Sequence, residues 1–146
     1  MAYALQADVE SAVGGRQRLV ELCDDQGNGK IDATLLSAQI AAADGWIDGF
    51  LQERHATPLS PVPQVVKDLS ARNTAFLLKQ RRRALEEDDR LQRQEDYDYL
   101  LQVSKGLLSL GTEPQPSKSS QDAAKTIDRD AVDEEDNSRT NTRGFW

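Results

Sequence analysis

The chain has 146 residues, enough for one small domain, and only 38% of them are hydrophobic, so part of it is expected to stay outside any core. A net charge of −7 excludes a protein whose main task is to grip nucleic acid by its phosphates, although it suits one past which nucleic acid must slide. A lone Cys23 excludes an internal disulfide, and no apolar run approaches the ~20 residues of a membrane span. We therefore expect a protein made in a cytosol, with no membrane partner.

Four stretches of helical pattern are predicted, separated by turn signals. Residues 5–23 form one helix, or two short ones broken at Gly14-Gly15. A polar turn over 24–32 ends at Asp32, whose carboxylate suits the N-cap of the next helix. That long helix carries one apolar face at steps of three and four residues, made of Leu36, Ile40, Ala43, Ile47, Phe50 and Leu51.

The third helix follows a proline-rich segment, 57–63, that no helix can cross. Pro63 suits the first helical position, because its missing N–H would have no partner there. Asn73 falls near the apolar face and needs a polar partner if it is buried. The helix ends in a basic cluster, favourable at the negative end of the helix dipole, made of Lys79, Arg81, Arg82 and Arg83.

The fourth helix starts in the acidic run 86–89. Its first half is polar apart from Leu91, and we predict that this half projects from the bundle. Its second half is predicted to pack on the bundle through a set of apolar residues, Tyr97, Leu100, Leu101, Val103, Leu107 and Leu108.

Gly111 is predicted to close the folded part, so residues 1–111 are interpreted as an all-α domain, a small bundle of about four helices. Residues 112–146 are interpreted as a long, extended, acidic C-terminal tail. Eight acidic and five basic side chains leave this tail at −3, and it has almost no bulky apolar residue before its end. Such a segment cannot bury enough surface to fold alone.

The polar turn imitates a calcium loop. Five residues fall at EF-hand positions one, three, five, six and nine, namely Asp24, Gln26, Asn28, Gly29 and Asp32. The twelfth position, however, is Leu35 instead of the bidentate Glu. We favour a structural connecting turn in which Gly29 takes positive φ and the acids cap backbone amides, with no metal and no other cofactor.

His55 is the one histidine of the chain, and it follows the long helix. A catalytic base or a metal ligand needs convergent partners, and no second His, nearby Cys or nucleophile motif is present. We favour a surface histidine at a helix terminus and predict that the protein is not an enzyme.

The last four residues, after the polar turn and His55, are the third candidate functional feature: Arg143, Gly144, Phe145 and Trp146. Leaving two aromatic side chains exposed at the end of a polar tail is unfavourable, since burying both contributes several kcal/mol, on the order of 3–5, from apolar area. Trp and Arg are also frequent at the energetic centres of protein interfaces. We interpret this terminus as a docking anchor.

The helical part resembles the Mu-type head protein family of tailed phages, whose members are usually interpreted as head–tail connector or adaptor proteins. The resemblance covers roughly residues 3–111. It rests on an ordered set of segments: Gly-Lys-Ile-Asp (29–32), Ala-Ala-Ala-Asp-Gly-Trp-Ile-Asp-Gly-Phe-Leu (41–51), Pro58-Leu59, Pro61-Val62-Pro63, and a helix that ends in an arginine cluster. The chain departs from the family pattern at His55-Ala56 and in its long acidic tail.

The resemblance implies a structural virion protein, assembled in the host cytoplasm and placed in the neck between head and tail. Identical subunits, usually twelve, form a ring under the portal protein, extend the DNA channel and receive the next neck or tail protein. Packaged DNA passes through without sequence-specific binding, as a net negative ring would allow. The aromatic terminus then serves as the portal-docking anchor.

A ring requires head-to-tail contacts that close by rotation. Opposite charges at one end of the third and fourth helices are candidates for such contacts: Arg81, Arg82 and Arg83 on one subunit, Glu86, Glu87 and Asp88 on the next. The competing interpretation is pairing within one chain, of Arg82 with Glu86 and Arg83 with Glu87, worth a few tenths of a kcal/mol each, about 0.3.

Three other functions remain open. A stopper or tail-completion protein of the same neck has the same helical pattern. A small calcium-responsive binding protein would use the polar turn, and calorimetric titration with calcium distinguishes it. A cytosolic regulatory helical protein would use the tail as a recognition peptide, and it would be a stable monomer without affinity for portal complexes.

Overall fold

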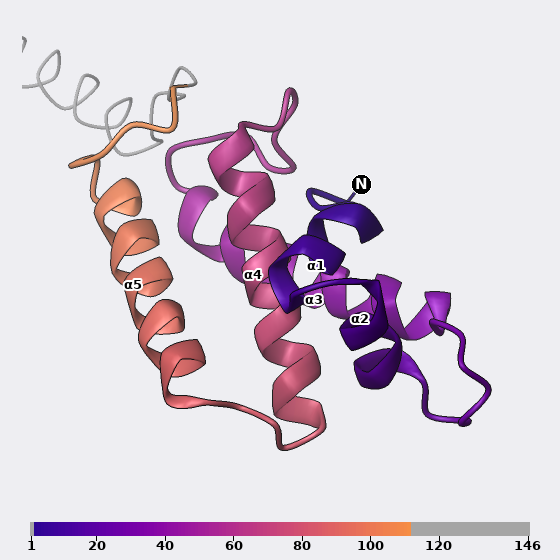
Figure 1. The fold of residues 1–146 in the computed structure, drawn as a ribbon. Helices are drawn as coiled ribbons and strands as arrows, with labels where there is room; N and C mark the ends of the chain where they lie inside the picture. Colours follow the sequence, from indigo (N-terminus) through magenta and orange to yellow (C-terminus); the bar gives the residue numbers. More distant parts are fainter. Residues whose placement is uncertain (1, 112–146) are drawn as a thin grey trace, which may run out of the picture. The chain divides into compact units, whose positions relative to one another are not determined.

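The computed structural model describes residues 2–111, which are helical throughout their regular structure and contain no strand (Figure 1). The all-α prediction is therefore confirmed for this part of the chain. The helices are α1 (Gln6–Val13), α2 (Arg16–Cys23), α3 (Ala33–Leu51), α4 (Gln64–Arg81) and α5 (Glu87–Ser104). Residues 112–146, with the predicted tail and its anchor, lie outside the described residues.

Residues 5–23 form two short helices and not one continuous helix, which is one of the two predicted forms. Gly14 ends α1 with φ of 99°, and Gly15 follows with φ of 129°. These positive values favour glycine, because a Cβ clashes with the backbone there. The N–H of Gly15 donates to the carbonyl of Glu10 at 2.8 Å, which satisfies one of the last carbonyls of α1.

The ends of α3 and α4 follow from local chemistry. The Asp32 carboxylate accepts the N–H groups of Thr34 (3.0 Å) and Leu35 (3.1 Å), which confirms it as the N-cap of α3. Pro63 is the N-cap of α4 and not its first helical residue, one position from the prediction. Among the described residues, no helix combines the length and the apolar character needed to cross a membrane.

Helices α3 and α4 run antiparallel and share two apolar clusters. At one end, the first half of α3 and the second half of α4 meet α1 and α2, with Leu36, Ile40, Ala75 and Leu78 in contact with Val9 and Leu19. At the other end, the second half of α3 and the first half of α4 meet α5, with Ile47, Leu51, Val66 and Leu69 in contact with Leu100 and Val103. The predicted apolar face of α3 is buried apart from Phe50, which is half-buried.

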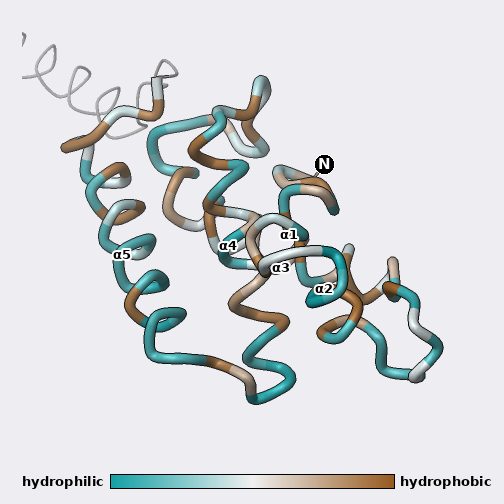
Figure 2. Tube along the Cα trace, viewed as in Figure 1, coloured by the Kyte–Doolittle hydropathy of each residue, from teal (hydrophilic) through white to brown (hydrophobic). Residues whose placement is uncertain are grey.

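The packing of α5 differs from the prediction at both ends. Its first half does not project: it lies along α4, held by polar side chains, and Figure 2 shows that α5 is hydrophilic over most of its length. Beyond α5, Leu107 and Leu108 were expected to be packed, yet they are 71% and 41% exposed. The helix ends at Ser104, so these two leucines no longer follow its apolar face.

Candidate functional site

The N-terminal segment is tied into the fold through two aspartates of α3. The N–H of Tyr3 donates to Asp44 Oδ2 at 2.9 Å, and the Tyr3 hydroxyl donates to Asp48 Oδ1. The same hydroxyl oxygen accepts the N–H of Leu59 at 3.0 Å, from the proline-rich loop. Asp44 also accepts the hydroxyl of Ser70 on α4 at 2.5 Å. We call this arrangement the Tyr3 clamp; it joins three distant segments to α3.

The Tyr3 clamp is buried, so its hydrogen bonds matter for stability. Tyr3 is only 3% exposed, and Asp44 and Ser70 are buried as well. Burial, reinforced by the hydrogen bond to Asp48, raises the pKa of Tyr3 well above its ordinary value. Asp44 and Asp48 are the two aspartates of the 41–51 segment, and the clamp supplies a structural reason for both.

The polar turn has the geometry of a connecting turn. Asp24 accepts the N–H groups of Asn28 (3.1 Å) and Gly29 (2.7 Å), and Gly29 has φ of 73°. The hydrogen bond from Gly29 is the main cause that lowers the pKa of Asp24, and the Asn28 N–H adds to it. In residues 2–111 no three His, Cys, Asp or Glu side chains are grouped as metal ligands.

His55 is buried, 8% exposed, so its interpretation as a surface histidine was wrong. The backbone N–H of His55 donates to the carbonyl of Leu51 at 2.8 Å, so His55 lies in the turn that directly follows α3. Burial lowers the pKa of the imidazole, and the neighbouring Arg54 charge adds to the effect. The burial of this side chain depends on tertiary contacts and not on local pattern.

The predicted interface charges divide into two groups. Arg81 and Arg82 both form ion pairs with Asp25 of the polar turn, and the distance from Arg82 to Asp25 is 2.8 Å. Neither arginine pairs with the acidic run 86–89. Because α4 ends at Arg81, the spacing from Arg82 to Glu86 does not lie on one helix.

The remaining predicted interface charges are exposed at the α4–α5 turn. Arg83 has φ of 56°. Neither Arg83 nor Asp88 forms an ion pair within residues 2–111. Glu87 approaches only Arg90, at 3.7 Å, and both side chains are well exposed. These charges are therefore available for contacts with another molecule.

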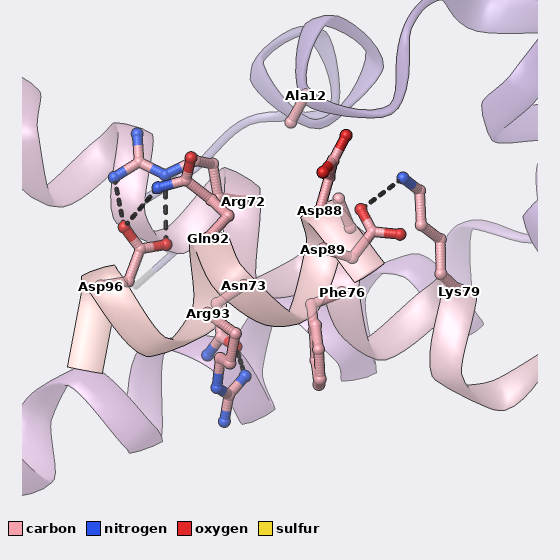
Figure 3. A pocket seen from close by; sticks show the side chains of 11 residues that line it. Ala12, Arg72, Asn73, Phe76, Lys79, Asp88, Asp89, Gln92, Arg93 and Asp96 are labelled. Carbon is pink, nitrogen blue, oxygen red and sulfur yellow. Dashed lines mark hydrogen bonds and ion pairs between the residues drawn. The ribbon is translucent and has the colours of Figure 1, made fainter. Parts of the chain in front are cut away.

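A cleft of about 270 Å³ lies between α4 and α5, with α1 at its edge (Figure 3). Two ion pairs cross it: Lys79 with Asp89 at 2.7 Å, and Arg72 with Asp96 in a two-bonded pair of 2.8 and 3.1 Å. For Asp89, burial acts to raise the pKa, but the hydrogen bonds from Lys79 and from the backbone outweigh it and lower the pKa. The pocket is too small for most cofactors, which occupy about 300–1,000 Å³.

Arg93 and Asn73 complete the wall of this cleft. The Arg93 guanidinium stacks on Trp46, 4.1 Å from the ring centroid, and lies 4.7 Å from that of Phe76. It also donates to Asn73 Oδ1, which supplies the polar partner that Asn73 was predicted to need. Burial lowers the pKa of Arg93. Arg72, Arg93 and Asp96 were not predicted as site residues, because partners 20 or more residues apart have no sequence signal.

Comparison with known proteins gives one finding of similarity. Residues 3–128 match the model of the family described as Bacteriophage Mu, Gp36, which is most of the chain and extends 17 residues beyond the expected boundary at 111. No curated protein matches the chain.

Proposed function

Because the chain belongs to the bacteriophage Mu Gp36 family, and is thus a phage protein of the structural or morphogenesis class, we propose that it is a head–tail adaptor. In this role it docks as a ring under the portal, extends the DNA channel and offers the surface to which the tail attaches. Family membership over residues 3–128 is the observation that carries the proposal. The fold supports it as a compact helical body with charged side chains left available at one end.

The ring contact is proposed to use the α4–α5 turn. Arg83 and Asp88 have no ion pair within residues 2–111, so their charges are not compensated inside the subunit. In a ring, the arginine of one copy and the acidic run of the next meet in the head-to-tail manner that closed cyclic assemblies require. Arg81 and Arg82 take a smaller part, because Asp25 already engages them.

The charge of the whole chain supports the proposed DNA channel. At a net charge of −7 per subunit, a dodecameric ring repels the phosphates that pass through it, so DNA slides instead of binding. Neither sequence-specific DNA contact nor catalysis is required of the subunits.

Portal attachment is assigned to the last four residues, Arg143, Gly144, Phe145 and Trp146. The two aromatic side chains enter an apolar pocket of the portal, and the linker that precedes them provides the reach. A stopper or tail-completion role in the same neck differs only in the layer that the ring occupies, which electron microscopy of particles distinguishes directly.

A charge-swap experiment tests the ring. Arg83→Glu and Glu87→Arg alone should each prevent attachment of the protein to filled heads, and the double variant should restore it. Arg16→Glu, at an exposed site on α2, is the control and should attach normally. Attachment by both single variants at wild-type occupancy would contradict the contact.

A second experiment tests the anchor. Phe145→Ala with Trp146→Ala should abolish attachment to portal-containing heads, whereas Thr140→Ala with Thr142→Ala should not. Normal occupancy of the heads by the aromatic double variant would show that the anchor is elsewhere.

A further inference from the structure

We propose that a second copy of this chain docks on the outer side of α3, and that it does so through its Leu107 and Leu108. We call the receiving surface the α3 face; it consists of Ala38, Ala42, Gly45 and Gly49, which are exposed, and of the half-buried Trp46 and Phe50. The contact joins neighbouring subunits head to tail. It therefore rests on the ring proposed above, and it names a contact of that ring apart from the α4–α5 turn.

The outer side of α3 carries no charge, although 29% of the chain is charged. The charged residues of this helix are Asp44 and Asp48, and both are engaged in the Tyr3 clamp. Its exposed residues are alanines, glycines, Thr34 and Ser37. A helix that faces solvent ordinarily presents charged side chains on that side. The uncharged outer side of α3 is typical of a helix that another molecule covers.

Gly45 and Gly49 are not explained by the fold of one subunit. Both lie inside α3 without a positive φ, so the backbone conformation does not require glycine. A Cβ at either position would meet no atom within 4 Å, so packing inside the subunit does not require glycine either. Glycine inside a helix is less favourable than alanine, and its advantage is the close approach of another chain.

A row of aromatic side chains borders these glycines. Trp46 lies three residues before Gly49, so the two are neighbours on the helix surface. The Trp46 ring contacts Phe50 edge to face, with ring centroids 5.3 Å apart. Phe50 contacts Tyr97 of α5 in the same way at 5.5 Å, and Tyr97 is 41% exposed. The aromatic row therefore offers apolar contact to a side chain that lies over the glycines.

Leu107 and Leu108 are the complementary surface. They are 71% and 41% exposed, and they follow α5 in a segment that is not helical. Gly106, with φ of 78°, turns the chain away from the helix just before them. A single exposed leucine needs no explanation, whereas an adjacent pair forms an apolar patch. Large apolar side chains on one copy and small uncharged residues on the next are complementary in the way that a head-to-tail contact requires.

Charge selects a second copy as the occupant. Lys105 precedes the leucines, and the Arg54 guanidinium lies against Gly106, so the leucines have positive neighbours. The α3 face is followed by the exposed Glu53. Within residues 2–111, neither Lys105 nor Glu53 forms an ion pair. Two chains of net charge −7 repel each other where acidic surfaces meet, and this contact avoids that repulsion.

The test is sedimentation velocity of the full chain in solution at up to about 1 mM, where a contact with a Kd in that range is populated. We expect the average mass to rise with concentration beyond that of a dimer, because head-to-tail contacts propagate. A chain that stays monomeric, or that stops at a dimer, would overturn the proposal. Attachment to heads is not involved in this measurement, so its failure and the failure of the adaptor role are separate results.

Two variants separate the two sides of the contact. Leu107→Ser with Leu108→Ser removes the docking side chains, and Gly45→Gln with Gly49→Gln covers the α3 face. Each double variant alone should self-associate about tenfold more weakly than the wild type. An equimolar mixture of the two should form one-to-one dimers, because one protein keeps its α3 face and the other keeps its leucines. Wild-type association by either variant, or a mixture without dimers, would contradict the contact.

Matched controls and a stability measurement exclude a general effect on the fold. Leu91→Ser, at a position of α5 that is 57% exposed, and Ala7→Gln, at an exposed position of α1, should self-associate like the wild type. The glutamine double variant should unfold at a higher denaturant concentration than the wild type, because glycine destabilises a helix interior. Weaker association together with higher stability would show that the glycines serve the contact. Weaker association of the two controls would show that the effect is not specific to this surface.

Discussion

Two of the interfaces of α4, with α3 and with α5, are built in different ways. Toward α3, it packs through two apolar clusters and is linked by Ser70 to the buried Tyr3 clamp. Toward the first half of α5, it faces a cleft crossed by two ion pairs and bordered by a stacked arginine. Apolar burial dominates folding stability, whereas partly exposed ion pairs contribute little. The α3–α4 interface therefore supplies more of the folding stability than the contact between α4 and the first half of α5.

The largest effect is expected inside the apolar clusters. Ile47→Ala removes a fully buried side chain and should lower the free energy of unfolding by about 3 kcal/mol. Leu91→Ala on α5 is the control: the side chain is 57% exposed, and its loss should change stability by less than about 0.5 kcal/mol. Denaturant unfolding followed by circular dichroism measures both, and equal losses would refute the contrast between the interfaces.

The next effect concerns Asp44. Replacement by alanine leaves the Ser70 hydroxyl and the Tyr3 N–H buried without an acceptor, so we expect a loss of about 2 kcal/mol. Asp98→Ala, at an exposed position of α5, should be close to neutral. An Asp44→Ala protein as stable as the wild type would mean that water replaces the carboxylate.

Tyr3→Phe is a smaller change, because only the hydroxyl is removed. We expect a loss of about 1 kcal/mol below pH 10. The folded-state pKa of Tyr3 is raised above the unfolded value of 10.0, so the unfolded chain releases this proton first. The stability it contributes is thus complete below pH 10 and is lost as the pH rises further. Between pH 8 and pH 11, the free energy of unfolding should fall more steeply with pH for the wild type than for Tyr3→Phe. An equal pH dependence of the two proteins would contradict the raised pKa.

The smallest effect is expected across the cleft. Lys79→Met breaks the ion pair with Asp89, whose two side chains are 17% and 19% exposed, and should cost less than about 1 kcal/mol. The measurement is again the unfolding midpoint in denaturant. A loss comparable to that of Ile47→Ala would show that this ion pair stabilises the fold and does not merely position α5.

Local chemistry made much of the fold predictable from the sequence. Asp32 as a cap and the break at Gly14-Gly15 depend on neighbours within a few residues: the cap was predicted correctly, and the break is one of the two forms that the sequence left open. The burial of His55 and the exposure of Leu107 and Leu108 depend on where a turn sends the chain, which periodicity does not encode.

The clamp and the cleft required the structure. Tyr3 and Leu59 are 56 residues apart, and Arg72 and Asp96 are 24 apart, so no pattern in the sequence links them. Asp44 and Asp48 were noticed only as part of a family-like segment, without a role. Asn73 was the partial exception, because a polar residue on an apolar face requires a partner wherever the chain provides it.

The Tyr3 clamp also bears on the order of events during synthesis. The N–H of Leu59 that completes the clamp is translated 56 residues after Tyr3. The hydrogen bond between Tyr3 and Leu59 can therefore form only after the proline-rich loop has left the exit tunnel. A bulky fusion placed before Tyr3 would hinder the docking of Tyr3 onto the proline-rich loop, whereas a reporter placed beyond residue 111 would not.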